Sequence, residues 1–456
     1  MTGTYDVRIW AIRVRKGRPK PYQVRWKAGT SVFARSFGTR GLADSFRSGL
    51  IQATRRGEAF DAVTGLPESH VREQTSVTWY QHGLDYIDMK WPAAAGKSRI
   101  SAVETLTAVT PVLIRTDHGM PDPAILRSAL RRWAFNPPHR ADDMPADIRA
   151  ALSWIKRVSL PLTALQDDKT VCQVLDALAL KLDGTAASPD YLGRRRRVFY
   201  NILKYAVREG RLTENPLGTT DWEPSDSGID EINPRVVASP EQVRQLLTAV
   251  RSVGPRRGAR LVGFFACLYF AMLRPAEALA LRADDCHLPA SGWGRLELHQ
   301  TTPTVGKHWT DTGAGHEDRG LKNRPRRAVR IVPIPPELVA ILRRHIAQYG
   351  LAPDGRLFRG ESGGVLVPTS YRSVWQRARM SGLTPSQAAS PLAQRPYDLR
   401  HGGVSLRLNS GVPPTQVAEW AGHSVEVLLT IYARCIHGRD QVWYMLIDRA
   451  LGPGES

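Results

Sequence analysis

The sequence predicts a mainly α-helical protein with small β-sheets, an α+β fold class divided into three parts. Apolar and basic residues alternate with period two near the N-terminus, which indicates strands. Residues 75–217 show helical periodicity with few strand-like runs, and the remainder mixes helical segments with two short strand-like runs. A length of 456 residues and an apolar fraction of 42% are enough to bury a core in each part.

The N-terminal part, residues 1–65, is expected to form a three-stranded sheet with one helix. Alternation over Tyr5–Val14 and Tyr22–Lys27 is typical of half-buried strands, Ser31–Phe37 supplies a third, and Leu42–Arg56 has the pattern of an amphipathic helix. The exposed strand face would carry basic side chains in a geometry that fits a DNA groove, and a merely solvated basic hairpin is the alternative. The residues predicted to bind DNA here are Arg8, Arg13, Arg25 and Lys27.

The middle part, residues 75–220, is expected to be a helical domain. Its predicted helices are Val77–Lys90, Ile100–Arg115, Pro123–Trp133, Ala146–Arg157, Val171–Leu182 and Tyr191–Gly210. The last of them begins with a run of four arginines ahead of an apolar stripe: Arg194, Arg195, Arg196 and Arg197. Such a run is usually a solvated face, but beside the C-terminal motifs described below phosphate contact is the better interpretation.

A shift to Asp, Ser, Glu, Gly and Pro between Thr219 and Pro234 indicates an interdomain linker. The third part is therefore placed at residues 235–456, and Ser239 is predicted to cap its first helix, with a proline next. The apolar run Leu261–Leu273 predicts a buried helix. Because proline disfavours helical geometry in the residue before it, Arg274 should lie at a joint between two packed helices.

The charge of the chain favours a polyanionic partner, with nucleic acid the leading candidate. Lys and Arg number 63 against 43 Asp and Glu, a formal net charge of +20. The four cysteines show no short paired spacing, so neither a zinc site nor a disulfide framework is indicated, and no cofactor is expected. No apolar stretch of membrane-spanning length and no signal peptide are seen. We expect the protein to work in the cytoplasm, associated with the nucleoid.

Near the C-terminus lie Tyr397-Asp-Leu-Arg400-His401, then Ala421-Gly-His423, then Tyr432. Asp398 is expected to cap a helix that ends near Asn409. Two glycines inside that helix, Gly402 and Gly403, would each cost about 1 kcal/mol relative to alanine, which suggests close approach of another backbone. His423 and Tyr432 would be about 13.5 Å apart on one unbroken helix, so a break is predicted near Leu429-Thr430.

These motifs resemble the tyrosine recombinase (phage integrase) family, most closely the integrases of actinomycete mobile elements. Arg274 stands in the R-x-x-E context of the family's first catalytic arginine, and Lys322 stands on the connection ahead of the strand-like run Ala328–Ile334. The resemblance implies that Arg274 and Arg400 grip the scissile phosphate and that Tyr432 attacks it. Lys322 would then protonate the leaving 5′-oxygen, with Lys307 as the alternative.

One position departs from the commonest family pattern. Tyr397 stands where a histidine usually does, and a tyrosine can donate a hydrogen bond to a phosphate but does not titrate near neutral pH. General-base work at this position is therefore in doubt, and His423 and His401 are the groups that could assist.

The resemblance also implies an architecture and partners. The three parts would be an arm-type DNA-binding module, a helical core-binding (SAM-like) domain and a catalytic domain. Four protomers would bring two DNA attachment sites together, with an excision or directionality factor, or a host DNA-bending protein, as a further partner. Two alternatives remain open, namely a type IB topoisomerase-like enzyme that relaxes DNA and a non-catalytic DNA-binding regulator.

Overall fold

The computed structural model describes residues 3–69, 77–181, 184–218, 220–222, 233–321, 328–432 and 440–451. The chain divides into two compact units, an N-terminal unit of residues 1–227 and a C-terminal unit of residues 228–456. Both units are mainly helical with small antiparallel sheets, so the predicted fold class is confirmed. Within the described ranges, no helix is both long and apolar enough to cross a membrane.

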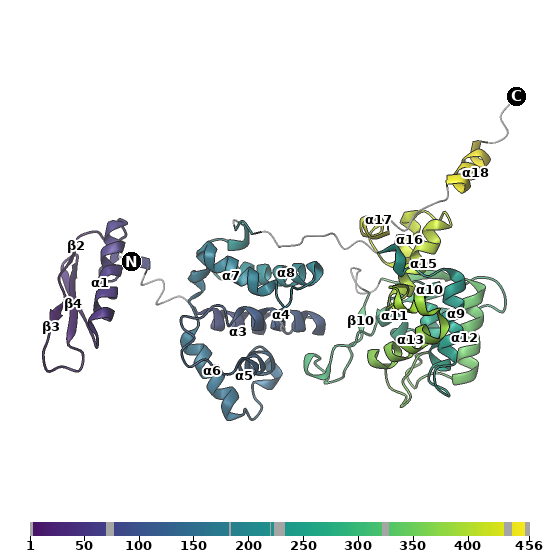
Figure 1. Cartoon of the computed structure of the whole chain (residues 1–456), viewed down its shortest axis with the longest axis horizontal. Helices are drawn as coiled ribbons and strands as arrows, with labels where there is room; N and C mark the ends of the chain where they lie inside the picture. Colours follow the sequence, from purple (N-terminus) through teal and green to yellow (C-terminus); the bar gives the residue numbers. More distant parts are fainter. Residues whose placement is uncertain are drawn as a thin grey trace. The chain divides into compact units, whose positions relative to one another are not determined.

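The N-terminal unit begins with a sheet that has a helix on one face (Figure 1). Its strands are β2 (Val7–Ile9), β3 (Arg13–Val14), β4 (Tyr22–Ala28) and β5 (Ser31–Phe37), followed by α1 (Arg40–Arg55), while β1 (Gly3–Thr4) pairs with β6 (Phe60–Asp61). β2, β3 and β5 each pair antiparallel with β4. The expected sheet and helix are thus confirmed, with the first predicted strand divided into β2 and β3.

Burial explains which face of this sheet meets the helix. Val24 and Trp26 of β4 are buried in one core with Leu50 of α1. Because side chains alternate along a strand, Arg25 and Lys27 project from the opposite face. The register pairs Lys27 with Arg8 across the strands, so basic side chains cluster on the face away from α1.

The rest of the N-terminal unit is helical, and each of the six predicted helices is present. The helices are α3 (Trp79–Lys90), α4 (Gly96–Val109), α5 (Pro123–Ser128) with a π-helical continuation η1 (Ala129–Ala134), α6 (Ala146–Val158), α7 (Asp168–Leu178) and α8 (Pro189–Arg208), and the short 3₁₀ turns are η2 (Pro137–His139), η3 (Leu162–Gln166) and η4 (Pro216–Gly218). α8 buries Phe199, Ile202 and Leu203 and packs on α3, α4 and α7.

The C-terminal unit surrounds one apolar helix, α10 (Val262–Phe270), whose nine residues are all buried. The helices of this unit are α9 (Pro240–Arg251), α11 (Pro275–Ala280), α12 (Pro336–Tyr349), α13 (Pro368–Gly382), α14 (Pro385–Ala389), α15 (Asp398–Asn409), α16 (Pro414–Ala421), α17 (Val425–Tyr432) and α18 (Asp440–Leu451), with 3₁₀ turns η5 (Pro234–Val236), η6 (Ala259–Leu261), η7 (Ala283–Asp285) and η8 (Lys307–Trp309). α9, α12 and α15 pack against α10. Ser239 caps α9 in a reciprocal capping box with Gln242, as predicted.

The strands of this unit lie in two small antiparallel sheets. β8 (Gly294–Leu298) pairs with β7 (Cys286–His287) on one side and β11 (Arg330–Ile334) on the other, and β9 (Gln300–Thr301) pairs with β10 (Arg319–Gly320). In β11, Arg330, Val332 and Ile334 are buried, and Ile331 between them is exposed. This alternation puts an arginine on the inner face of the sheet.

The glycines of α15 pack against the backbone of α10, which confirms the expected close approach. A β-carbon on Gly403 would overlap the carbonyl oxygen of Tyr269, and one on Gly402 would lie 2.9 Å from the ring carbon Cε2 of Tyr269. The contact fixes the first turn of α15, and with it Arg400, beside the end of α10.

Two local predictions are wrong. Asp398 is the first residue of α15 and not its cap, because Tyr397 already has helical dihedrals and the carboxylate turns back to accept from the backbone N–H of Arg395 at 2.7 Å. The break between His423 and Tyr432 lies before α17 and not near Leu429-Thr430, which are inside that helix. Gly422 adopts a left-handed conformation with φ of 69° and ends α16, and Ser424 accepts a bond from an amide of α17.

Candidate active site

The joint between α10 and α11 holds Arg274 as predicted. Met272 turns the chain with a positive φ of 53°, and Arg274 has extended backbone just before Pro275 starts α11. Glu277, in the first turn of α11, accepts bonds from both the backbone N–H of Arg274 (2.8 Å) and its guanidinium Nη1 (2.8 Å). The other end of the guanidinium donates to the carbonyl of Gly422 at 2.7 Å, which ties α11 to the end of α16.

Glu277 is the centre of a buried arginine cluster. Its carboxylate is 1% exposed and receives a bidentate pair of bonds from Arg330, at 2.9 and 2.7 Å, while a guanidinium nitrogen of Arg400 lies 3.9 Å away. Burial alone would raise the pKa of Glu277, but Arg330 first, and then Arg400 and Arg274, lower it to about 2. The carboxylate therefore stays ionised and holds three guanidinium groups together.

Arg330 is a member of this cluster that our sequence reasoning missed. The signal was present, because Arg330 is in phase with Val332 and Ile334 in the alternating strand pattern and a buried arginine must be paired or functional. Its partner Glu277 is 53 residues away in the sequence, and no local pattern names that pairing.

Arg400 is fully buried in the first turn of α15. It donates to the carbonyl of Met272 and, through Nη2, to the carbonyl of Ala421 and to Nε2 of His423, both at 2.7 Å. Its Nε has no hydrogen-bond partner among the described residues, and the same holds for Nε of Arg330. Unsatisfied buried donors are rare in folded proteins, so each of these two atoms could still donate to an acceptor.

The partner of His423 fixes the tautomer of its ring. A guanidinium can only donate, so Nε2 of His423 must be the acceptor and Nδ1 carries the proton. Burial first, and then Arg400 and Arg274, lower the pKa of His423 to about 3, which keeps the ring neutral. Within the part of the chain that the structure describes, Nδ1 of His423 is a buried donor without a partner.

Tyr432 and His401 form a hydrogen-bonded pair beside this cluster. The phenolic oxygen of Tyr432 lies 2.8 Å from Nδ1 of His401, and the ring centres of Tyr432 and His423 are 6.2 Å apart. Tyr432 has no exposed surface. Burial first, and then Arg400 and Arg395, lower the pKa of His401 to about 3. Tyr397 touches the site indirectly, with its ring edge on the ring of His401 at 5.0 Å between centres.

The structure thus brings together five of the residues singled out in the sequence. They are Arg274, Arg400, His401, His423 and Tyr432, joined by Glu277 and Arg330. Lys322 lies outside the described residues. Lys307 is exposed in η8, so the choice between the two lysines stays a prediction.

The residues predicted to bind DNA differ in their exposure to solvent. Arg8, Arg13 and Arg25 are exposed, and Lys27 forms a salt bridge with Asp6 at 3.1 Å on the same exposed sheet face. These side chains remain on a surface that a nucleic acid could reach.

In α8, Arg194 and Arg197 are exposed and Arg196 stacks on Trp222, but the burial of Arg195 argues against a DNA contact by that residue. Arg195 is 6% exposed, donates to the carbonyls of Leu178 and Leu180, and lies over the ring of Tyr191 at 4.4 Å. Its Nη1 is therefore used inside the fold.

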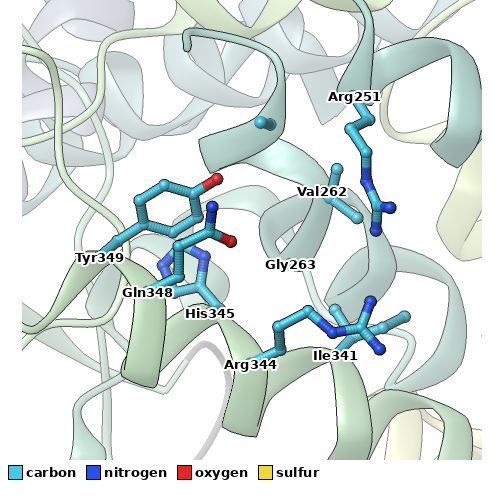
Figure 2. Close-up of a pocket in the computed structure, with 9 residues that line it drawn as sticks. Arg251, Val262, Gly263, Ile341, Arg344, His345, Gln348 and Tyr349 are labelled. Carbon is cyan, nitrogen blue, oxygen red and sulfur yellow. The ribbon is translucent and has the colours of Figure 1, made fainter.

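A separate pocket of about 170 Å³ lies at the opposite end of α10 from this site. Figure 2 shows it between α12, which carries Arg344, His345 and Tyr349, and the segment that holds Arg251 and Val262. No residue of the candidate active site lines it. Among the described residues, no cluster of acidic, histidine or cysteine side chains could hold a metal ion.

No family model matches the chain. Over 178 residues, 39% of the chain, it is 30% identical to the tyrosine recombinase XerC of Methylobacterium sp. (strain 4-46), and the match spans 46% of that relative's length.

Three solved structures show weaker likeness. The Tn1549 transposon integrase in complex with circular intermediate DNA has a TM-score of 0.46 and 18% identity, covering 72% of this chain and 99% of that one. A lambda integrase dimer bound to a core site has a TM-score of 0.47 and 13% identity, covering 94% and 95%. The XerH recombinase bound to a palindromic difH substrate has a TM-score of 0.45 and 12% identity, covering 77% and 96%. The chain is thus similar to a tyrosine recombinase over 39% of its own length, and it spans about half of that relative.

Proposed function

We propose that the protein is a site-specific DNA recombinase that integrates and excises a mobile element through a 3′-phosphotyrosyl intermediate. The observation that carries the proposal is the cluster itself. The hydroxyl of Tyr432 is hydrogen-bonded to the neutral His401. Beside this pair lie Arg274, Arg400 and His423, which come from three separate helix ends. No step of this chemistry requires a metal ion where arginines supply the positive charge.

Phosphoryl transfer needs an in-line nucleophile, neutralisation of charge on the non-bridging oxygens and protonation of the leaving group. Tyr432 is the nucleophile in this proposal. Arg274 keeps part of its guanidinium exposed, and Nε of Arg400 and Nδ1 of His423 are donors still to be satisfied, so the three can bind the non-bridging oxygens. The leaving 5′-oxygen would take its proton from Lys322 or Lys307.

The phosphotyrosyl bond stores the energy of the broken backbone bond, so strand exchange needs no ATP. In the conformation described here Tyr432 and Arg400 have no exposed surface. Binding of DNA must therefore open the site before the tyrosine can reach a phosphate.

The proposal includes the organisation of the chain and its partners. Residues 1–65 would be an arm-type DNA-binding module, residues 75–220 a core-binding domain and residues 235–456 the catalytic domain. The exposed basic face of the N-terminal sheet supports the first assignment. Four protomers would assemble on two double-stranded attachment sites in the cytoplasm, with an excision factor or a DNA-bending host protein as a further partner.

The test is the formation of a covalent adduct. The protein would be incubated with labelled DNA from next to its own gene, and complexes that survive SDS would be counted. We expect an adduct from the wild type and from Tyr444→Phe, a control at an exposed tyrosine of α18, and none from Tyr432→Phe.

Two other results would favour the alternatives. Tight binding without an adduct, on intact and on nicked DNA, would support a non-catalytic regulator. An adduct with relaxation of a supercoiled plasmid that carries no attachment site, and without recombinant products, would support a topoisomerase-like enzyme.

A further inference from the structure

We propose that His401 is a catalytic residue of this site and takes the proton of Tyr432 through Nδ1 as the tyrosine attacks the phosphate. This inference rests on the proposed function and assigns the general base within it. It starts from the 2.8 Å contact between Nδ1 of His401 and the phenolic oxygen of Tyr432. A general base must lie within hydrogen-bond reach of the proton that it removes, and 2.8 Å satisfies that requirement.

His423, the other histidine of the site, is in the wrong protonation state for this role. Its Nε2 lone pair already accepts from the guanidinium of Arg400 at 2.7 Å, so the proton of the neutral ring is on Nδ1. Such a ring can donate a hydrogen bond, and it has no free lone pair to receive a proton. His423 is therefore suited to bind a phosphate oxygen, and the task of accepting a proton is left to His401.

Tyr397 does not supply a base either. A neutral phenol has no basic nitrogen to take up a proton, and Tyr397 meets the site through T-shaped packing of its ring with the ring of His401. Tyr397 thus packs beside the imidazole whose Nδ1 lies 2.8 Å from the phenolic oxygen of Tyr432. Tyr397, which replaces the usual histidine, thus packs against the site. The group that takes up the proton is His401, four residues further on and one turn along α15.

The charges around His401 determine when it can act. Arg400 and Arg395 on its own segment oppose a positive ring, as does burial, and His423 faces it across the site as a neutral group. A bound phosphodiester adds one negative charge beside the same guanidinium groups, and an opposite charge favours the protonated ring. His401 is consequently a weak base in the free protein and a stronger one once DNA is bound.

The step is balanced in protons and electrons. The O–H bond of Tyr432 breaks and its proton goes to Nδ1 of His401, while the phenolic oxygen forms a bond to phosphorus. The P–O5′ bond breaks, and the 5′-oxygen takes a proton from the lysine general acid. On rejoining, a 5′-hydroxyl attacks the phosphotyrosine, its proton returns to the lysine, and the imidazolium of His401 gives its proton back to the departing phenolate.

The test compares His401→Asn, His401→Ala and His345→Asn, the last being a control at another buried histidine of the C-terminal unit. The amide of asparagine can keep a hydrogen bond at the Nδ1 position, but it cannot take up a proton. Single-turnover cleavage would be measured at saturating attachment-site DNA from about pH 6 to 9. A second substrate would carry sulfur in place of the bridging 5′-oxygen, because a thiolate leaves without protonation and the substrate bypasses the general acid.

We expect both His401 variants to bind DNA as the wild type does and to cleave about 10²–10⁴-fold more slowly. Their rates should rise about tenfold per pH unit, since they depend on the small fraction of tyrosinate, and the sulfur substrate should not restore them. His345→Asn should cleave normally. If His401→Asn cleaves at nearly the wild-type rate, the histidine only positions Tyr432 and the inference is overturned.

Two further results keep the inference separate from folding defects and from the proposed function. Nitrogen-15 spectra of histidine-labelled wild type should show Nδ1 of His401 unprotonated in the free protein, and a proton on that atom would refute the base assignment without any variant. If the wild type itself forms no adduct, the proposed function fails and takes this inference with it. Loss of cleavage in the His401 variants alone leaves the recombinase assignment standing.

Discussion

Replacing Glu277 by glutamine should lower the free energy of unfolding of the C-terminal unit by about 3–5 kcal/mol, because it leaves buried guanidinium groups without their counter-charge. The structure allows an independent estimate of the same effect. The pKa of Glu277 is lowered from 4.5 to about 2, and each pKa unit corresponds to about 1.4 kcal/mol, so the folded state favours the carboxylate by about 3 kcal/mol.

The assay is urea unfolding followed by hydrogen exchange of peptides from α10, which report on the C-terminal unit. Glu337→Gln is the matched control, because Glu337 also pairs with an arginine, Arg244 at 2.9 Å, but on the surface. That pair should contribute about 0–1 kcal/mol. Phosphate oxygens can replace part of the lost charge, so saturating attachment-site DNA should stabilise Glu277→Gln more than it stabilises the wild type.

The sign of the pH dependence follows from the lowered pKa. Stability due to Glu277 is present above pH 4.5 and is lost as the pH falls toward 2, so the wild type should weaken over that range and Glu277→Gln should show a flatter dependence. A loss below 1 kcal/mol at neutral pH, equal to that of the control, would refute the idea that Glu277 holds the arginine cluster together.

Three further predictions concern other parts of the fold. The pKa of His401 is lowered to about 3, so stability due to its neutral form is present above pH 6.5 and is lost as the pH falls. The loss of unfolding free energy between pH 7.5 and 5.5 should therefore be about 1 kcal/mol smaller in His401→Asn than in the wild type, in which His423 contributes in the same direction, and equal losses in urea unfolding would contradict it. Gly403→Ala should lower stability by about 1–3 kcal/mol in thermal unfolding, because the new methyl group meets the carbonyl of Tyr269, and an unchanged melting temperature would disprove that contact. Arg195→Ala should destabilise the helical domain and leave the salt dependence of DNA binding unchanged. Arg197→Ala, at an exposed position, should reduce the slope of log K against log salt by about 1 without loss of stability. The opposite result for the two variants would show that Arg195 contacts DNA.

Features that depend on neighbouring residues in the sequence were predicted better than contacts between residues far apart in the sequence. The proline after Arg274 placed that residue at a helix joint, and the glycine pair in α15 indicated a close backbone that proved to be α10. Both predictions depend on a few neighbouring residues. The bond from Arg330 to Glu277 depends instead on the folding of a strand against a helix 53 residues away, which no local pattern states.

Two errors came from patterns that could have been used better. Arg195 lies three residues after Leu192 and four before Phe199, so helical periodicity places it on the buried stripe, although a run of four arginines suggested a uniform surface. The break between His423 and Tyr432 was placed in the wrong turn, since Gly422 ends one helix in the left-handed region and the chain needs no second interruption.

The complete burial of Tyr432 affects how the protein would behave on a chromosome. If Tyr432 cuts DNA as proposed, its burial prevents cleavage during a brief collision with unrelated DNA. Cutting then requires a residence time on the DNA longer than the time the site takes to open. A DNA sequence that binds tightly stays bound long enough for the site to open, and a weakly bound sequence dissociates first. The selectivity of cleavage between DNA sequences then depends on residence time as well as on base recognition.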